Sequence, residues 1–401
     1  MSGPAERRGD PDDPLTRWRT LLEPASQPLL DAVAAGDTDD AATIAAIRRR
    51  WPASLVSTAI ELVRARRRAA AKFPAVASRL VADVEGVEQA TSARVAAHKA
   101  TRFRAAGCPR VLDLCCGIGG DAMALVNVTD VTAVDLDPLR LWMCGVNAGC
   151  ATQIADVATL DPAGVAIHLD PARRDEAGRR HRYADYRPGP DVLAALLSAA
   201  DAGAIKLGPG VDFDALPDTD RREIELISDG RALVQAVLWS GALARQPGLR
   251  TATMLPAGVS FTAAPDRPAD VPAEDERVAF LAVPDPALER AGLLGPWLRE
   301  HAGWELHPGL GIVASEDDLS SPWFTSFACL AHLPWREKHL RATLRTLDAG
   351  IVEVKTRGGA VDTDRWQRTL RGDGAETLTV FALRRDHRIT AWVTRRLGDE
   401  A

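Results

Sequence analysis

Hydrophobic and polar positions follow three different patterns along the chain, and each predicts a different kind of structure. From Leu15 to about Arg104, apolar residues recur every three or four positions, which is typical of amphipathic helices. From 105 to 250, short apolar runs alternate with helical stretches, as expected of a mostly parallel sheet. The first 14 residues are Pro, Asp, Gly and charged residues without an apolar pattern, which predicts a disordered tail.

The central segment gives the most detailed prediction. We expect strands over 110–114, 131–135, 151–155, 165–169, 203–207, 223–227 and 234–239, with helices such as 121–126, 138–147 and 190–200 between them. A Pro- and Ala-rich stretch then closes the sheet and continues as a linker. After about Arg277 the pattern resumes with a strand (278–283) and a helical segment (284–304). Further on it predicts a basic helix (336–347), a strand (351–359), a helix (364–370) and two strands (377–385 and 388–396).

The patterns indicate an α/β protein. Its 401 residues are long enough for two or three domains, and the changes of pattern predict where these begin and end. We expect a disordered tail (1–14), a basic helical domain (15–104), an α/β sheet domain (105–250), a linker with a connecting α/β segment (251–323) and a small α+β domain (324–398).

Charge is unevenly distributed along this chain. The net charge is −6, but the stretch from Ile44 to Arg110 holds fourteen Lys or Arg against four Asp or Glu. Such segregation is the electrostatic footprint of a nucleic-acid-binding face, with Trp51, Phe73 and Phe103 as the few aromatics that could stack bases. The alternative is a set of solvated helix faces.

The stretch RVLDLCCGIGGD, from Arg110 to Asp121, combines a strand, a glycine turn and a helix start. Glycine allows positive φ and close approach of a ligand, and a helix start offers free N–H groups. Asp113 inside the strand would repel a pyrophosphate but suits a cation such as a sulfonium or an ammonium. A second strand ends in Asp135, eighteen residues after Gly117, where a carboxylate can bind both hydroxyls of a ribose.

DLCCGIGGD followed by VTAVDLDP resembles motifs I and II of class I S-adenosylmethionine-dependent methyltransferases. The resemblance implies a Rossmann-like sheet and S-adenosylmethionine as cofactor. It places the methionine end at Asp113, Gly117 and Gly119, the ribose at Asp135, and the adenine amino group at Asp156 after the third strand. The full set of implied cofactor contacts is Asp113, Cys115, Gly117, Gly119, Gly120, Asp135, Leu136 and Asp156. The alternative is a βαβ unit without a ligand.

The fourth strand ends in Asp170-Pro171-Ala172-Arg173, the position of motif IV in this family. The resemblance implies catalytic roles for Asp170, Pro171 and Arg173: the acid orients the attacking nitrogen or shapes the surroundings of the sulfonium, and the proline stiffens the turn. Family members that methylate exocyclic amines carry (D/N)PP(Y/F/W), so the departure here argues against base stacking at this loop. RNA uracil-C5 methyltransferases carry DPPR but need a downstream cysteine nucleophile, and none lies between Cys150 and Cys329.

An arginine-rich loop follows this motif. Its arginines are 173, 174, 179, 180, 182 and 187, and such side chains bind phosphate through two parallel hydrogen bonds. We expect substrate contacts from Arg174, Arg179, Arg180, Tyr183, Tyr186 and, in the fifth strand, Lys206. The alternative is a mobile charged loop. His98 and Lys99, in the last helix before the glycine turn, lie close to the ligand in sequence, and His98 is either catalytic or a helix-packing residue.

The segment from about Phe324 to Arg396, with WREKHLRATLRTLDAGIVEVKTRGGAVD at its centre, is similar to the THUMP-like domain of bacterial methyltransferases. Because true THUMP domains help to bind tRNA, the resemblance implies RNA contacts from Lys355 and Arg357; the alternative is that both are solvated strand ends. With DPAR and KLGPG, this segment resembles one family of class I methyltransferases that carry a THUMP-like domain.

Composition excludes several other classes. The six cysteines form no C-x-x-C pair, so we expect reduced structural thiols and no metal. No stretch approaches the roughly eighteen apolar residues of a membrane span, and the polar N-terminus lacks the apolar core of a signal peptide. We therefore expect a cytoplasmic protein without membrane contact.

The leading hypothesis is an enzyme, a methyltransferase that acts on tRNA or rRNA at a base nitrogen. The second is a methyltransferase of a small molecule or a protein, and the third is an RNA-binding protein that keeps the fold without turnover. The sequence leaves the acceptor atom and the oligomeric state open.

Overall fold

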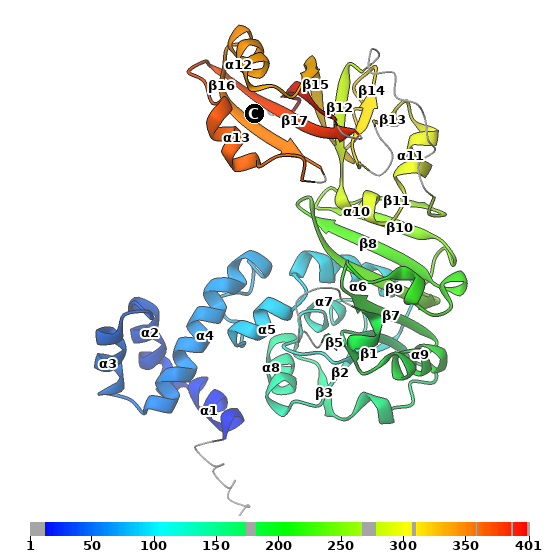
Figure 1. The fold of residues 1–401 in the computed structure, drawn as a ribbon. Coiled ribbons are helices and arrows are strands. Elements are labelled where there is room, and N and C mark those ends of the chain that lie inside the picture. The colour runs from blue at the N-terminus through cyan, green and yellow to red at the C-terminus, as the bar shows by residue number, and fades with distance from the viewer. Residues whose placement is uncertain are drawn as a thin grey trace, which may run out of the picture. The chain divides into compact units, whose positions relative to one another are not determined.

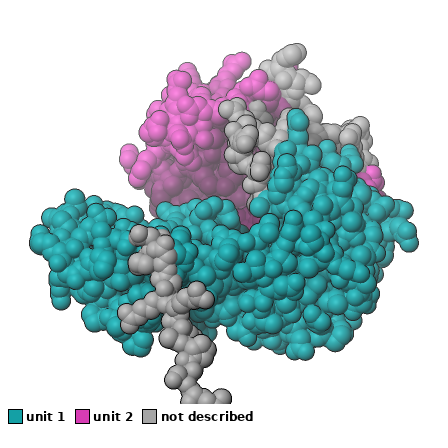
Figure 2. All heavy atoms as spheres, turned by 90° about the horizontal axis from the view of Figure 1, so that it is seen from below, with its two compact units in different colours: residues 1–223, 236–247 teal, residues 224–235, 248–401 magenta. Residues whose placement is uncertain are grey.

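The computed structural model describes residues 13–173, 182–266, 278–306, 310–357, 359–385 and 388–398. The chain forms two compact units (Figure 2). Unit 1 comprises Met1–Glu223 and Ala236–Pro247, and unit 2 comprises Ile224–Gln235 and Gly248–Ala401. The predicted disordered tail lies outside the described residues, apart from its last two positions.

The N-terminal part of unit 1 is helical, as predicted (Figure 1). Its elements are α1 (Pro14–Leu21), η1 (Pro24–Ser26), α2 (Gln27–Ala35), α3 (Ala41–Arg48), α4 (Ala53–Lys72), α5 (Val84–Gln89) and α6 (Ala93–Ala105). Aspartates define several starts, because the side chains of Asp13, Asp40 and Asp83 accept backbone N–H groups of the first turn.

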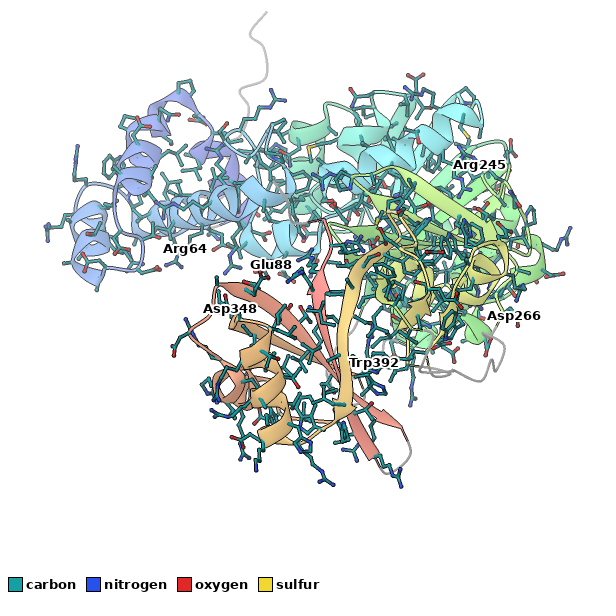
Figure 3. All side chains as sticks on the ribbon, turned by 90° about the horizontal axis from the view of Figure 1, so that it is seen from above. Arg64, Glu88, Arg245, Asp266, Asp348 and Trp392 are labelled. Atoms are coloured by element: carbon teal, nitrogen blue, oxygen red, sulfur yellow. The ribbon has the colours of Figure 1, made fainter. Side chains whose placement is uncertain are left out.

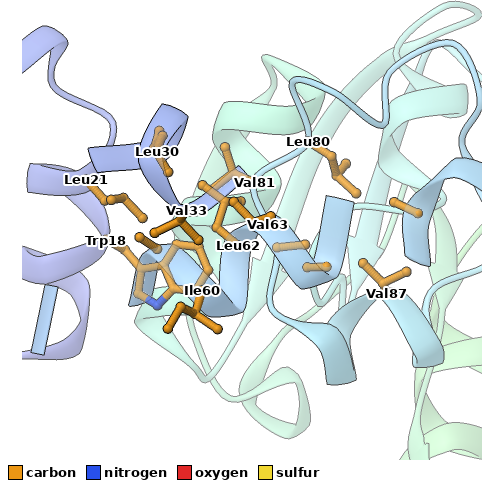
Figure 4. Packing of buried hydrophobic residues seen from close by; sticks show 14 of the residues in the cluster. Trp18, Leu21, Leu30, Val33, Ile60, Leu62, Val63, Leu80, Val81 and Val87 are labelled. Atoms are coloured by element: carbon orange, nitrogen blue, oxygen red, sulfur yellow. The ribbon is translucent and has the colours of Figure 1, made fainter. Parts of the chain in front are cut away.

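A hydrophobic core joins these helices to the glycine turn. Figure 4 shows Trp18, Val33 and Ile60 within it. The same cluster includes Ile118 from the turn and Met143 from α8 (Pro138–Ala148). The helical region therefore supports the wall of the site from outside, through ordinary apolar packing.

The sheet of unit 1 has the order β9-β7-β4-β1-β2-β3. Its strands are β1 (Arg110–Leu114), β2 (Asp130–Asp135), β3 (Ala151–Ile154), β4 (Ala166–Leu169), β7 (Ala202–Leu207) and β9 (Ala232–Gly241), of which only the last runs antiparallel to its neighbour. Leu114 pairs in register with Val134 and Leu169, so β1, β2 and β4 end at one edge. The predicted strands and their order along the chain are confirmed.

Short elements complete unit 1. Two further helices connect strands of this sheet: α7 (Ala122–Leu125) follows β1, and α9 (Pro190–Ala199) precedes β7. Between β4 and α9 lies a two-stranded hairpin, which the sequence did not predict, made of β5 (Ala172–Arg173) and β6 (Tyr186–Arg187). The 3-10 turns are η2 (Val157–Thr159), η3 (Tyr183–Asp185), η4 (Phe213–Ala215) and η5 (Thr219–Arg221).

Unit 2 contains two groups of strands. The first, in the order β11-β10-β8, consists of β8 (Glu223–Asp229), β10 (Arg250–Leu255) and β11 (Val259–Ala263). The second has the order β13-β14-β12-β15-β18-β17-β16. Its members are β12 (Phe280–Pro284), β13 (Trp304–Glu305), β14 (Val313–Ser315), β15 (Phe324–Pro334), β16 (Ala349–Thr356), β17 (Glu376–Arg385) and β18 (Arg388–Arg396).

The helices of unit 2 are α10 (Pro286–Arg290), α11 (Leu294–Glu300), α12 (Glu337–Thr346) and α13 (Thr363–Leu370). The last two pack on one face of the C-terminal sheet, where Leu340 and Leu370 share a core with Val380. The next residue, Phe381, belongs to a second core with Phe327. Alternation of successive side chains along β17 thus builds one core on each face.

The expected linker region, 251–323, contributes strands to both groups, and β13, β14 and the long β15 were not predicted. Their segment mixes apolar and polar residues without a clean period of two. In β15 a register shift between Cys329 and Ala331 also interrupts the alternation of side chains. The last helices and strands of the chain, which have regular patterns, lie where the sequence placed them.

Candidate active site

A cavity of about 860 Å³ opens at the carboxyl ends of the strands of unit 1. This is the edge at which open α/β sheets bind ligands. The wall opposite the strands comes from α5 and the residues that follow it, such as Ala90 and Thr91. Most of the residues predicted for the cofactor line this cavity: Asp113, Cys115, Gly117, Gly120, Asp135, Leu136 and Asp156.

The glycine turn has the geometry that its sequence requires. Gly117 has a φ of 54°, and a Cβ placed there would meet nothing within 4 Å, so the floor of the cavity is open above it. Gly119 has a φ of 87°, and its Cβ would lie 2.9 Å from the Sγ of Cys144. Gly119 is therefore a packing residue that lets the turn sit on α8, and it contributes to the site indirectly.

Asp135 closes one side of the turn. Its two carboxylate oxygens accept the backbone N–H groups of Gly117 (2.9 Å) and Asp137 (3.0 Å). Each oxygen keeps a further lone pair for a ligand hydroxyl. The adjacent Leu136 is 64% exposed, and Asp156, beyond β3, accepts the N–H of Ala158 at 3.0 Å. The predicted ribose and adenine residues thus lie along one cavity wall.

Asp113 lies deeper, at the end of a chain of buried polar groups. Its Oδ1 lies 2.7 Å from Nδ1 of His168, whose Nε2 lies 3.0 Å from Nζ of Lys99. The lysine forms an ion pair of 2.7 Å with Asp121, which also accepts a hydrogen bond from Thr91. All of these side chains are buried. We call Asp113, His168, Lys99 and Asp121 the buried relay.

Sequence reasoning placed only one member of the buried relay, Asp113, in the site. It singled out His98, but that residue does not line the cavity, and its neighbour Lys99 joins the relay instead. A signal was available: His168 interrupts the apolar strand VAIHLD, and Lys99 falls on the apolar side of its helix. Polar residues in such positions need buried partners.

Burial and charge shift the two carboxyl groups of the relay in opposite directions. Burial raises the pKa of Asp113, and the hydrogen bond from His168 opposes this only in part. Burial would also raise the pKa of Asp121, but the charge of Lys99 outweighs it and holds that pKa below its usual range.

Asp170 follows β4 and lines the same cavity, together with Pro171. Its Oδ2 forms an ion pair of 2.7 Å with Nζ of Lys206, which also donates to the carbonyl of Gln89 at 3.1 Å. The structure therefore joins two residues predicted for separate roles, one catalytic and one in substrate binding. Arg173 is the last residue of β5.

The arginine-rich loop gives a mixed outcome. Arg174, Arg179 and Arg180 lie outside the described residues. Arg187, on β6, lines the cavity and is exposed.

The two tyrosines do not match the substrate contacts that the sequence predicted for them. Tyr183 and Tyr186 are 4% and 1% exposed, with ring centroids 6.1 Å apart. The hydroxyl of Tyr186 accepts the N–H of Gly208 at 2.7 Å. The hairpin of β5 and β6 turns both rings into the protein, so they are core residues in this structure. Sequence reasoning missed this because the arginines around the two tyrosines indicated a substrate-binding loop.

The basic N-terminal helices are also less available than their charge suggests. Several side chains bind main-chain carbonyls: Arg64 that of Thr38, Arg66 that of Leu80, Arg67 that of Ala34, and Lys72 those of Val87, Glu88 and Ala90. Arg64 and Arg68 also pair with Asp39 and Glu88; Arg64 and Glu88 are labelled in Figure 3. Internal partners thus account for much of the local positive charge.

Three arginines at the end of α3 remain exposed, Arg48, Arg49 and Arg50. The guanidinium of Arg50 lies over the ring of Trp51, 4.5 Å from its centroid. The other aromatics expected to stack bases, Phe73 and Phe103, are fully buried.

In unit 2 the residues predicted for RNA contact already have acidic partners. Lys355 pairs with Glu353 at 2.8 Å, and Arg357 lies 3.4 Å from Glu289. Both cations are about 40% exposed. More open positive charge is found on and beside α12 and α13, at Arg336, Lys338, Arg345, Arg365, Arg368 and Arg371.

Two other kinds of feature, a metal site and a membrane-spanning helix, are not found within the described ranges. No group of three or more His, Cys, Asp or Glu residues there could hold a metal ion. None of the helices in the same ranges is long and apolar enough to cross a membrane.

Comparisons with known proteins agree with this geometry. Residues 324–396 match the family model described as THUMP domain-like. An uncharacterised S-adenosylmethionine-dependent methyltransferase of Mycobacterium tuberculosis is 34% identical over 340 residues, which cover 81% of this chain and 92% of the relative. The crystal structure of a candidate methyltransferase from Porphyromonas gingivalis W83 covers 96% of this chain and 98% of its own, with a TM-score of 0.70 and 18% identity, a likeness that shows the fold alone. This chain therefore belongs to the S-adenosylmethionine-dependent methyltransferases, with a Rossmann-like sheet and a C-terminal THUMP-like domain.

Proposed function

We propose that this enzyme methylates a base nitrogen of RNA, in tRNA or rRNA, in the cavity of unit 1. The observation that carries the proposal is the Asp170–Lys206 pair, which stands at the same strand edge as the acids predicted for the cofactor. One carboxylate is thus fixed at the place where an acceptor would meet the methyl donor. As part of the proposal, we keep 105–250 as the methyltransferase domain and 324–398 as the THUMP-like domain.

The residues of the cavity fit S-adenosylmethionine. Oδ2 of Asp113 is buried and has no hydrogen-bond partner among the described residues, so it offers an acceptor to an ammonium group. Gly117 leaves room above the turn, and Asp135 has lone pairs for two hydroxyls. Leu136 offers an exposed apolar side chain to the adenine ring, and Asp156 an acceptor to its amino group.

When bound, S-adenosylmethionine supplies a methyl group that its sulfonium already activates. The chain then has to hold the acceptor nitrogen in line and close, about 3–3.5 Å from that methyl. Lys206 occupies Oδ2 of Asp170, and the described structure gives no partner for Oδ1. We assign Oδ1 to accept an N–H of the acceptor amine, with Pro171 and Arg173 shaping the adjoining turn.

The protonated state of the cysteine thiol at the cavity also favours a nitrogen acceptor over a uracil carbon. A uracil carbon requires a cysteine thiolate as nucleophile. Cys115 lines the cavity, but burial, together with the charges of Asp135 and Asp170, raises the pKa of its thiol, so it remains protonated and unreactive.

RNA as the acceptor molecule is supported by the THUMP-like match and by exposed cations. Arg187 stands at the cavity, and further cations lie on and beside α12 and α13. Arg48, Arg49 and Arg50 are exposed at the end of α3, and Arg50 lies over the ring of Trp51. Arginine suits phosphate because its planar fork matches two oxygens at once. On this proposal the enzyme acts in the cytoplasm, where tRNA and rRNA are found.

A second candidate, a protein or small-molecule acceptor, is favoured by one observation. Much of the charge on α4 is bound to carbonyls and acids of the same unit. That charge cannot count toward an RNA-binding face.

The test is methyl transfer from tritiated S-adenosylmethionine to total RNA of a host strain that lacks the gene, followed by mass spectrometry of the nucleosides. We expect one methylated nucleoside to appear with the wild-type enzyme and to be absent with Asp170→Asn. Labelled protein or metabolites with unlabelled RNA would favour the second candidate and contradict the proposal.

A further inference from the structure

The buried relay lies immediately behind the cavity and joins four separate elements of unit 1. Asp113 comes from β1, His168 from β4, Lys99 from α6, and Asp121 precedes α7. Asp113 and Asp121 line the cavity, whereas His168 and Lys99 stand behind them. The last two are 0% and 1% exposed.

The hydrogen bonds of the relay fix the position of each proton. A lysine ammonium only donates, so the contact between Lys99 and Nε2 of His168 requires that nitrogen to accept. The imidazole proton then resides on Nδ1 and is donated to Oδ1 of Asp113. Oδ2 is left without a partner among the described residues. One oxygen is thus held, and the other keeps an unused acceptor in a residue that lines the cavity.

The charges of the relay do not balance within the protein. With a neutral imidazole, the relay holds one cation, Lys99, and two carboxylates, Asp113 and Asp121. Burying an uncompensated carboxylate is strongly unfavourable, and a matching cation relieves that cost. The vacant acceptor oxygen of Asp113 is where such a cation would bind.

We propose that His168, Lys99 and Asp121 are positioning residues: Asp121 holds Lys99, Lys99 fixes the tautomer of His168, and His168 holds Asp113 so that its Oδ2 is aimed at the α-ammonium of the cofactor's methionine moiety. This inference rests on the proposed placement of that moiety at Asp113. It does not depend on which acceptor receives the methyl group. The relay therefore acts on recognition of the amino-acid end, while Asp135 and Asp156 act on the adenosine end.

The test compares two ligands that share the adenosine end. S-adenosylhomocysteine carries the amino-acid part with its ammonium, and 5′-methylthioadenosine lacks it. Calorimetry on the full-length protein gives the ratio of the two dissociation constants. Loss of a positioned hydrogen bond to a charged group typically weakens binding about 10- to 100-fold, and the effect should fall on S-adenosylhomocysteine alone.

Two substitutions of His168 separate positioning from mere folding. The amide nitrogen of His168→Asn can occupy the place of Nδ1 and still donate to Asp113, so we expect S-adenosylhomocysteine to bind within about threefold of wild type. The amide of His168→Gln reaches toward Lys99 and leaves Asp113 without its donor. We expect that variant to lose about 10- to 100-fold in affinity for S-adenosylhomocysteine and less than about twofold for 5′-methylthioadenosine.

The matched control is Arg102→Met, which breaks the buried ion pair of 2.6 Å between Arg102 and Glu223. Arg102 lies on the same helix as Lys99, one turn further along. The control should lower the melting temperature but leave the ratio of the two dissociation constants unchanged.

A measurement on the wild-type protein covers the case in which His168 variants do not fold. In a sample with ¹⁵N-labelled histidine, NMR should show the Nδ1–H tautomer for one buried ring, and its resonance should shift with S-adenosylhomocysteine but not with 5′-methylthioadenosine. Three results would each overturn the inference. His168→Gln could weaken the binding of both ligands equally, or the Asn and Gln variants could bind S-adenosylhomocysteine equally well. The histidine resonance could also shift equally with both ligands. If wild type binds neither ligand, the proposed cofactor site itself fails.

Discussion

Two charged regions of unit 1, the cavity edge and the N-terminal helices, were both predicted from sequence as binding surfaces, and they differ in how their charges are used. At the cavity edge, Asp113, Asp135 and Asp170 each accept internal donors yet keep an oxygen or a lone pair for a ligand. On α4, Arg66 and Arg67 direct their donors at carbonyls of the same unit. A count of charges therefore predicts a binding face only where internal partners leave part of each charged group free.

The largest expected effect concerns Asp170. In Asp170→Asn, the acceptor amine loses the carboxylate that we assign to it, and a positioned acid–base group typically contributes about 10²- to 10⁴-fold. We expect kcat for RNA methylation to fall about 100- to 1,000-fold while the affinity for S-adenosylhomocysteine stays within about threefold. The measurement is steady-state kinetics with calorimetry in parallel. Asp161→Asn, on the exposed loop before β4, is the control. A parallel loss of cofactor affinity would place Asp170 in cofactor binding instead.

A second prediction is a pH dependence of cofactor binding. Burial raises the pKa of Asp113 above the ordinary 3.8, so its carboxylate is protonated at a higher pH than an exposed one. Below that pKa the ligand ammonium loses its partner, and the affinity for S-adenosylhomocysteine should fall up to about tenfold per pH unit. Above it, the affinity should be constant. The affinity for 5′-methylthioadenosine should not change over the same range.

Several other titratable groups act on Asp113. His168, Lys99 and Asp121 contact it through the buried relay. Burial and neighbouring thiols or carboxylates raise the pKa of the cysteines nearby, so these thiols remain neutral in acid; they are Cys115, Cys116, Cys144 and Cys150. Asp113→Asn should remove the pH dependence. A slope that persists in that variant would assign the titration to another group.

The third prediction separates the two kinds of arginine. Replacing Arg48, Arg49 and Arg50 together by Gln removes exposed cations, so RNA affinity should fall at least about tenfold near 0.1 M salt. The slope of log affinity against log salt should decrease by about two to three units. The matched control replaces Arg64, Arg67 and Arg68, which have internal partners, and should change RNA affinity less than about threefold. Filter binding at several salt concentrations gives both quantities. Equal losses in the two triple variants would show that internal pairing does not matter for binding.

The smallest effect is on stability. Arg66→Met leaves the carbonyl of the buried Leu80 without its donor, which should lower the free energy of unfolding by about 1–3 kcal/mol. Arg49→Met, at an exposed position, should change it by less than about 0.5 kcal/mol. Urea unfolding followed by circular dichroism measures both, and similar values for the two would remove the distinction drawn on α4.

Sequence reasoning located the cavity well because its signals are local. The spacing of Asp113, Gly117 and Asp135 fixes a strand, a turn and a second strand, and parallel strands must end at a common edge. The strands and helices of the α/β part follow regular patterns and were therefore predicted closely. The same is true of α12, α13, β17 and β18.

What escaped prediction depends on contacts between residues far apart in sequence. The pairing of His168 with Asp113 and Lys99 spans 55 and 69 positions, so it cannot be derived from a motif. The burial of Tyr183 and Tyr186 depends on the hairpin of β5 and β6, whose strands are too short to leave a pattern. The internal bonds of Arg66 and Arg67 likewise require knowing how α4 packs.

The most direct test of the whole account is a crystal structure of the protein with S-adenosylhomocysteine. We predict that the ligand fills the cavity of unit 1, with its ribose hydroxyls on Asp135 and its ammonium on Oδ2 of Asp113. A ligand bound elsewhere, or one in the cavity whose ammonium lies away from Asp113, would contradict the account.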